Sequence, residues 1–258
     1  NKRYRLLQMK ILTSPAKLMN IEQSNAFLKT TIPHFIEQAE MIQNTLKTKS
    51  SKYLSELMEI SPKLADENWE RNQKWKANPK SNESATALMA FSGEVYRALD
   101  AKSLDEKSVK YLQKNYRMLS GLYGLLKPSD RIMLYRLEMG RKFQFDDYKN
   151  LYEFWTDKIT EQLNSELSSK DVVLNLASNF KVIDKTKIKV PVIDFEFFNY
   201  KEGKLKTIVV YSKHARGLVA RFCAQNQVKT LNEVKGFNLE NYLIDEELST
   251  QTKLVFTR

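Results

Sequence analysis

Cysteine, histidine and glycine are scarce in this chain of 258 residues. The single cysteine, Cys223, excludes an internal disulfide, and two histidines, His34 and His214, are too few for a Cys/His metal site. Seven glycines together with 11% aromatic residues argue against a disordered or fibrous chain. We therefore expect a globular protein with no metal and no cofactor.

Long apolar runs are missing as well. The chain has no stretch of about 18 apolar residues, which argues against a membrane-spanning helix. Its N-terminal region also lacks the apolar core of a secretion signal. We expect a cytoplasmic protein that is long enough to bury a sizeable core.

Acidic residues are outnumbered by basic ones, and the formal net charge is +11. Three positive charges (Lys2, Arg3 and Arg5) precede Met9, which looks like a natural start, so we predict that residues 1–8 are an extension. Eleven less three leaves an excess of eight positive charges. This excess favours an anionic partner such as nucleic acid or phosphate, but charge that only keeps the protein soluble explains it equally well.

The hydrophobic pattern divides the chain into two parts. Residues 33–115 are predicted to be mostly helical, and strands mixed with helices follow from residue 117. We expect an α/β fold in one domain over residues 9–258, with a mixed parallel and antiparallel sheet as its core and a helical N-terminal region. The predicted strands are 9–13, 171–177, 190–198, 205–211 and 253–257, and the predicted helices include 33–47, 83–91, 103–115, 150–167 and 213–225.

Several local signals fix where these elements begin and end. Ser103 and Glu106 have the spacing of a capping box. Ser61 is expected to cap a helix that has Pro62 at its first position. Residues 201–204 (KEGK) have the composition of a hairpin turn.

Residues 118–140 are the most informative stretch of the chain. Two glycines and Pro128 constrain the backbone, and arginines with one carboxylate, Glu138, follow the turn. This pattern suits a loop that holds an anion, and it suits equally a buried connection in which Arg136 and Glu138 pair internally. Glu138 is the best candidate for acid–base chemistry, although no partner carboxylate is evident from the spacing.

The helix predicted at 213–225 has one apolar face, which includes Cys223, and one basic face. Cys223 is therefore interpreted as a packing residue. Gly217 falls in the middle of the basic face, where a missing side chain would let a ligand approach. The alternative is a basic face that is simply solvated. The basic face carries Lys213, His214, Arg216 and Arg221.

Polar residues follow two of the predicted strands. Lys17 comes after the first strand and could neutralise a phosphate or act as a general base, or it is an ordinary exposed lysine. Asn175 and Ser178 end another strand and could bind a ligand or cap the strand end. Lys63 follows the turn of a helical pair at 57–65, which loosely resembles a helix-hairpin-helix but lacks its Gly-x-Gly.

These motifs, in this order and over the chain from Met9 to its C-terminus, resemble the YaaA family of peroxide stress resistance proteins. Two departures are visible. Leu134 stands where the family usually has proline, and residues 179–181 (NFK) replace the family's usual acidic residue and tyrosine, so no role for a glutamate there carries over. The matching segments are 14–17 (SPAK), 120–130 (SGLYGLLKPSD), 135–140 (YRLEMG), 175–178 (NLAS), 215–217 (ARG) and 236–237 (GF).

The resemblance implies an α/β domain of unusual topology with a basic cleft and a helix-hairpin-helix element over residues 57–68. It also implies binding of double-stranded DNA, protection against hydrogen peroxide and lowered intracellular free iron. The cleft candidates that the resemblance supplies are Lys17, Arg136, Glu138, Asn175, Ser178, Lys213 and Arg216, and the residues themselves add Lys63 and Arg221 as DNA- or anion-binding candidates.

Two hypotheses follow. The first is a DNA-binding protein of oxidative stress defence, with double-stranded DNA as partner, no membrane and no obligatory protein partner evident. The alternative is an enzyme acting on a phosphorylated or nucleic-acid substrate, with Lys17 and Glu138 as catalytic candidates. Convergence of the candidates in a narrow pocket would favour the enzyme, and a wide groove would favour the duplex. Direct iron sequestration is disfavoured, because no ligand cluster is recognisable.

Overall fold

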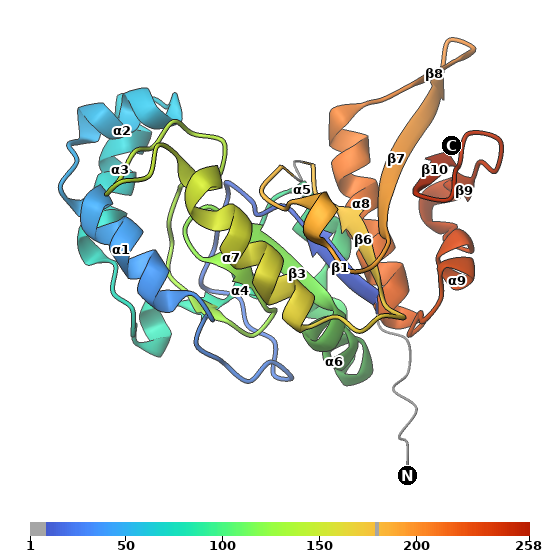
Figure 1. Cartoon of the computed structure of the whole chain (residues 1–258), viewed down its shortest axis with the longest axis horizontal. Helices are drawn as coiled ribbons and strands as arrows, with labels where there is room; N and C mark the ends of the chain where they lie inside the picture. The colour runs from blue at the N-terminus through green and yellow to red at the C-terminus, as the bar shows by residue number, and fades with distance from the viewer. Residues whose placement is uncertain (1–8, 179–180) are drawn as a thin grey trace.

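The computed structural model describes residues 9–178 and 181–258 (Figure 1). The predicted extension at 1–8 and two residues of the departing segment, Asn179 and Phe180, lie outside these ranges. Within the described ranges, no helix is long and apolar enough to cross a membrane.

The centre of the described chain is an eight-stranded sheet with the order β4-β3-β1-β6-β7-β10-β9, in which β8 pairs with β7. The five strands from β3 to β10 run parallel, whereas β4, β8 and β9 are antiparallel to their neighbours. This arrangement confirms the predicted mixed sheet. The strands are β1 (Met9–Thr13), β2 (Ala85–Thr86), β3 (Tyr116–Ser120), β4 (Gly124–Leu126), β5 (Arg131–Ile132), β6 (Val172–Leu176), β7 (Val192–Lys201), β8 (Lys204–Lys206), β9 (Leu243–Ile244) and β10 (Lys253–Thr257).

Helices cover the sheet, and every residue of β1 and β3 is buried, as expected for strands covered on both faces. In Figure 1, α1, α2 and α3 gather at one end of the molecule, and α8 and α9 lie at the other. The helices are α1 (Ile36–Lys47), α2 (Ser51–Met58), α3 (Pro62–Lys74), α4 (Ala87–Ala90), α5 (Glu94–Leu99), α6 (Glu106–Asn115), α7 (Leu151–Ser165), α8 (Val209–Gln225) and α9 (Leu231–Lys235), with 3-10 turns η1 (Ser81–Glu83), η2 (Ala101–Ser103), η3 (Lys185–Lys187) and η4 (Leu239–Asn241).

Two basic side chains are buried in the sheet and share one carboxylate. Lys10 and Arg117 lie 2.8 and 2.6 Å from Glu166 Oε2. Lys10 also donates to the carbonyl of Lys114, and Arg117 donates to the carbonyl of Gln113. Burial by itself would raise the pKa of Glu166, but the two cations hold it at about 2. Each charge is therefore paired, as burial requires.

Three local predictions are wrong. The helix expected at 83–91 is only the short α4, because residues 85–86 pair with β5 instead. The cap of α6 is Asp105, which accepts from the Ser108 N–H, and Ser103 bonds to Asp100. The run 205–211 leaves the sheet after Lys206, where β8 ends, and Val209 begins α8.

Gly217 has a different role from the predicted one. It is buried where α8 crosses α5, and a Cβ at this position would lie 2.0 Å from the carbonyl oxygen of Val95 and 2.7 Å from Ala98 Cβ. The space beside Gly217 is therefore filled by α5 and is not open to a ligand.

Substituting Gly217 by alanine should destabilise the protein, although helix propensity alone favours alanine by about 1 kcal/mol. The added methyl has no room against the α5 backbone, so we expect the free energy of unfolding to fall by about 1–3 kcal/mol. Urea denaturation measures it. Gly140→Ala is the control, because its Cβ would meet only the Tyr152 hydroxyl, at 3.6 Å. Equal stability of both variants would contradict the packing role.

Candidate functional site

A pocket of about 600 Å³ lies at the edge of the sheet where the parallel strands β1, β3 and β6 end. Its walls come from six regions of the chain: the loop 14–18 after β1, the start of α5, residues 119–121 at the end of β3, the segment 135–141, Leu176, Ser178 and Val182 around the end of β6, and α8. Ligands of sheets with parallel strands commonly bind at this edge. Among the predicted candidates, the pocket wall contains Lys17, Arg136, Glu138, Ser178, Lys213 and Arg216.

Buried hydroxyl groups fix the inner walls of the pocket. The Tyr96 hydroxyl donates to the carbonyl of Ser14 at 2.8 Å, which ties α5 to the loop after β1. The hydroxyls of Ser120 and Tyr135 lie 2.6 Å apart and join β3 to the segment 135–141. Burial raises the pKa of Tyr96 well above its usual value, so this phenol stays neutral and keeps its donor proton.

Gly121 permits the close approach of the segment 135–141. A Cβ on Gly121 would lie 2.3 Å from the carbonyl oxygen of Leu137. The indole N–H of Trp155 in α7 donates to the Gly121 carbonyl at 2.9 Å, which holds the turn from the other side. The glycine noticed in the sequence therefore shapes the pocket by packing.

Glu138 lies at the centre of three cations. Its carboxylate is 3.2 Å from Lys17, 3.4 Å from Arg136 and 3.4 Å from Arg141. Only 13% of the Arg136 side chain is exposed, and its Nε is buried without a hydrogen-bond partner among the described residues. Arg141 also pairs with Glu59, so two carboxylates face three cations, and the remaining positive charge lets this part of the pocket accept a further anion.

α8 supplies the opposite wall. Arg216 is mostly enclosed and donates to the carbonyl of Leu176 at 3.0 Å; burial lowers its pKa, and Asp194 opposes that shift. Lys213 is exposed and has no ion-pair partner in the described part of the chain. The pocket lining contains five lysines and arginines against two glutamates, an excess of three positive charges.

Other predicted residues do not line this pocket. Asn175 donates to Asp194 at 2.6 Å and accepts from the N–H of Ala177, the geometry of a strand-end cap. Arg221 donates to the carbonyls of Leu99 and Asp100 at the end of α5. Cys223 is buried, and burial raises the pKa of its thiol to about 12, which agrees with its predicted packing role.

The helical pair around Lys63 is α2 and α3, and its turn lies at the rim of the pocket. Ser61 caps α3 with Pro62 at the first position, as predicted. Glu59 in the turn has a left-handed backbone (φ 53°) and forms a 2.8 Å ion pair with Arg141. Residues 51–74 contain four basic and five acidic side chains, so the hairpin as a whole does not attract phosphate.

Sequence reasoning missed the connection between this turn and the pocket. Arg141 follows the central run, but nothing in the sequence indicated that Glu59, more than eighty positions earlier, would pair with it. Glu94 and Tyr96 also line the pocket and were not predicted. Their position depends on how α5 packs on α8, which local patterns do not encode.

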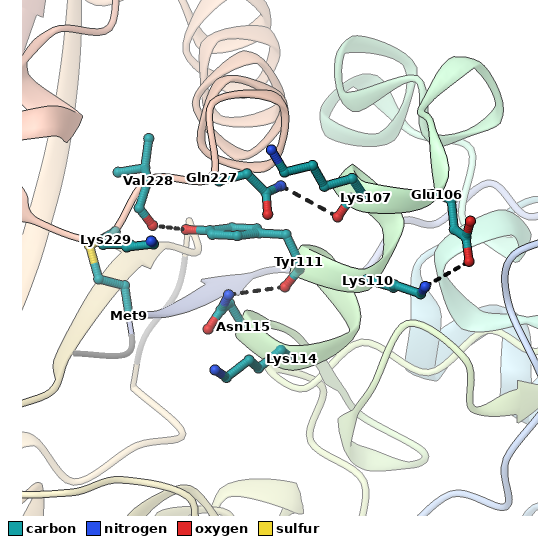
Figure 2. Close-up of a pocket in the computed structure, with 10 residues that line it drawn as sticks. All are labelled: Met9, Glu106, Lys107, Lys110, Tyr111, Lys114, Asn115, Gln227, Val228 and Lys229. Carbon is teal, nitrogen blue, oxygen red and sulfur yellow. Dashed lines mark hydrogen bonds and ion pairs between the residues drawn. The ribbon is translucent and has the colours of Figure 1, made fainter. Parts of the chain in front are cut away.

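A second pocket, of about 430 Å³, lies beside α6 and the start of β1 (Figure 2). Lys107, Lys110 and Lys114 come from α6, and Lys229 comes from the chain after α8. Glu106 lies 2.7 Å from Lys110, so four lysines face one carboxylate. Because Met9 begins β1, this pocket lies at the opposite edge of the sheet from the first.

His214 links three elements behind the first pocket. Its Nδ1 is 2.7 Å from Glu94 in α5 and its Nε2 is 2.8 Å from Glu240 in η4. Arg97 and Arg258 pair with the same two carboxylates. Burial by itself would lower the pKa of His214, but the two carboxylates outweigh it and raise the pKa. Among the described residues, no three or more His, Cys, Asp or Glu side chains are grouped as metal ligands would be.

Comparisons with known proteins agree with the motifs. The profile of a protein family described as "Peroxide stress protein YaaA" matches residues 9–248. The chain is 46% identical to a "UPF0246 protein" of Flavobacterium johnsoniae, 44% identical to one of Flavobacterium psychrophilum and 40% identical to one of Francisella philomiragia. Each alignment covers 97% of this chain and all of the relative.

His214 should make the stability of the protein depend on pH. Because its folded pKa lies above the unfolded value of about 6.5, its contribution is complete below that pH and is lost as pH rises through the folded pKa. We expect wild type to lose roughly 0.5–1 kcal/mol relative to His214→Gln between about pH 6 and pH 9. Urea unfolding at both pH values tests this, and parallel curves for the two proteins would contradict it.

Proposed function

The chain belongs to the family of the peroxide stress protein YaaA, and on this basis we propose that it is a DNA-binding protein of the peroxide stress response. The family description supports the role in peroxide stress. The proposed partner is double-stranded DNA, bound through its phosphates by the basic rim of the first pocket.

The ion pair between Glu59 and Arg141 carries this proposal. It joins the turn of the α2–α3 pair, which Lys63 follows, to Arg141 in the wall of the pocket that Lys17 also lines. Lys213 in α8 adds a third exposed cation from the opposite wall. Exposed lysines spread over several elements suit contact with successive phosphates of a duplex.

Size and charge limit where the duplex can lie. A double helix, whose major groove alone is about 12 Å wide, is too large for a pocket of about 600 Å³. The duplex therefore lies across the rim. The acidic residues of α2 and α3 restrict the contribution of this pair to its turn, where Lys63 and the N-terminus of α3 can meet a phosphate. The family resemblance also implies that the protein lowers intracellular free iron. This role stays an expectation that rests on the resemblance.

One observation favours a second candidate, an enzyme acting on a phosphorylated or nucleic-acid substrate. Lys17 and Arg136 both lie within ion-pair distance of Glu138 in the wall of one pocket, which is the geometry expected of an active site. In this candidate, Glu138 exchanges a proton with the substrate and the arginines hold its anionic group.

The DNA proposal predicts that two lysines at the rim of the first pocket contribute more to duplex affinity than two exposed lysines elsewhere on the protein. We expect Lys17→Ala/Lys213→Ala to weaken duplex binding roughly tenfold and to lower the slope of log affinity against log salt by about 2, because two phosphate contacts are lost. Fluorescence anisotropy with a labelled duplex at several salt concentrations measures both quantities.

The matched control is Lys107→Ala/Lys114→Ala, which removes the same charge at the second pocket (Figure 2). This control should bind nearly as wild type does. If the control loses affinity and the rim variant does not, the duplex lies at the opposite edge of the sheet and the proposal is wrong.

The enzyme candidate predicts a different result for Glu138→Gln. A general acid–base residue contributes about a hundredfold or more to a rate, so turnover of a DNA or nucleotide substrate should fall by that factor while binding is kept. Product formation is followed by electrophoresis of an end-labelled duplex and by chromatography of nucleotides. Absence of product with the wild-type protein removes this candidate.

A further inference from the structure

Leu18 is an exposed apolar side chain at the mouth of the first pocket. It follows Lys17, lines the pocket, and is 61% exposed. Its backbone is held, because the Leu18 carbonyl accepts from the N–H of Ser92 at 3.0 Å and Met19 bridges to Phe91. The fixed backbone thus presents an apolar group beside a cation. Covering the leucine by a partner would be favourable, because it removes apolar surface from water.

The interior of the pocket has three kinds of surface below Leu18. Aliphatic side chains such as Leu119 and Leu176 form part of the wall. Arg136 provides a buried guanidinium with an unused Nε. Ser14 and Ser178 bring two hydroxyl groups 3.0 Å apart near the mouth. A ligand that matches all three has an apolar part, hydrogen-bonding groups and a negative charge.

A nucleotide has these properties. The base offers flat faces and polar edges, and the phosphate provides the charge. A volume of about 600 Å³ lies within the range of pockets that enclose one small ligand. One nucleotide can enter where the duplex cannot.

Resting on the proposed binding of DNA, we infer that the pocket receives one nucleotide swung out of the duplex while Leu18 enters the vacated place in the base stack. Apolar side chains act as wedges between base pairs in several DNA-binding proteins. Rotation of a nucleotide out of the stack costs least where the base is mismatched or damaged. The pocket therefore selects duplexes that contain a weakened base pair.

The test uses a duplex with one 2-aminopurine, a base whose fluorescence rises when it leaves the stack. The duplex also has a dye at one end, so anisotropy of the dye reports binding and 2-aminopurine emission reports extrusion in the same sample. With the full chain in saturating amount, we expect a several-fold rise in emission when 2-aminopurine lies opposite a mismatched cytosine. We also expect roughly tenfold tighter binding than to a duplex with thymine opposite.

Two variants separate extrusion from binding. Leu18→Ala removes the wedge, and Met139→Trp fills part of the pocket from a partly buried apolar wall position without changing the charge. Both should bind the duplex within about threefold of wild type and lose most of the rise in emission. Leu243→Ala in β9 is the matched control, because Leu243 is also 61% exposed and does not line the pocket. It should keep the full rise.

The outcomes distinguish the two proposals. Saturated binding of the duplex without a rise in emission overturns extrusion and leaves DNA binding in place. An equal rise with wild type and Leu18→Ala overturns the role of the wedge. No binding of any duplex overturns the proposed function, and extrusion with it. Binding of free deoxynucleoside monophosphate alone, measured by calorimetry, would then assign the pocket to a free small molecule.

Discussion

The close contact of α8 with α5 is the constraint on which the pocket depends. At Gly217 a side chain is absent and the Val95 carbonyl occupies its place, so the two helices approach more closely than any larger residue would allow. This contact sets α8 across from the loop after β1, which brings Lys213 and Arg216 opposite Lys17. The residues that lie between α5 and α8 belong to the core. The residues at the edge of this helix contact form part of the pocket wall.

Two clusters in this protein combine one glutamate with several cations, and burial separates their roles. Glu166 with Lys10 and Arg117 is enclosed, and backbone carbonyls accept further protons of both cations. No buried side-chain nitrogen or oxygen of these three residues lacks a hydrogen-bond partner. Glu138 is partly exposed, and Arg136 beside it keeps a nitrogen without an acceptor in the described chain. Similar sets of charged groups are therefore enclosed in one place and partly open to the pocket in the other, because their burial differs.

The two pockets also differ in how far their charged residues are buried. Each has an excess of three positive charges in its lining. The lysines of the second pocket are exposed and come mainly from one face of α6 (Figure 2), where water screens them. The cations of the first pocket come from three separated regions, and two of them are arginines largely removed from water. The number of charged residues in a pocket therefore indicates a binding site less well than the burial of those residues does.

The sequence by itself determined the elements whose signals are local. Strands 9–13 and 253–257, the cap at Ser61, and the turn at 202–203 agree with the structure, because alternation, capping and positive φ act over a few residues. Its motifs also determined the family. Only the tertiary structure decided that residues 85–86 pair with β5, that Gly217 faces α5, and that Glu59 reaches Arg141. Each of these contacts joins segments far apart in the chain, and their geometry depends on packing energies that no local pattern contains.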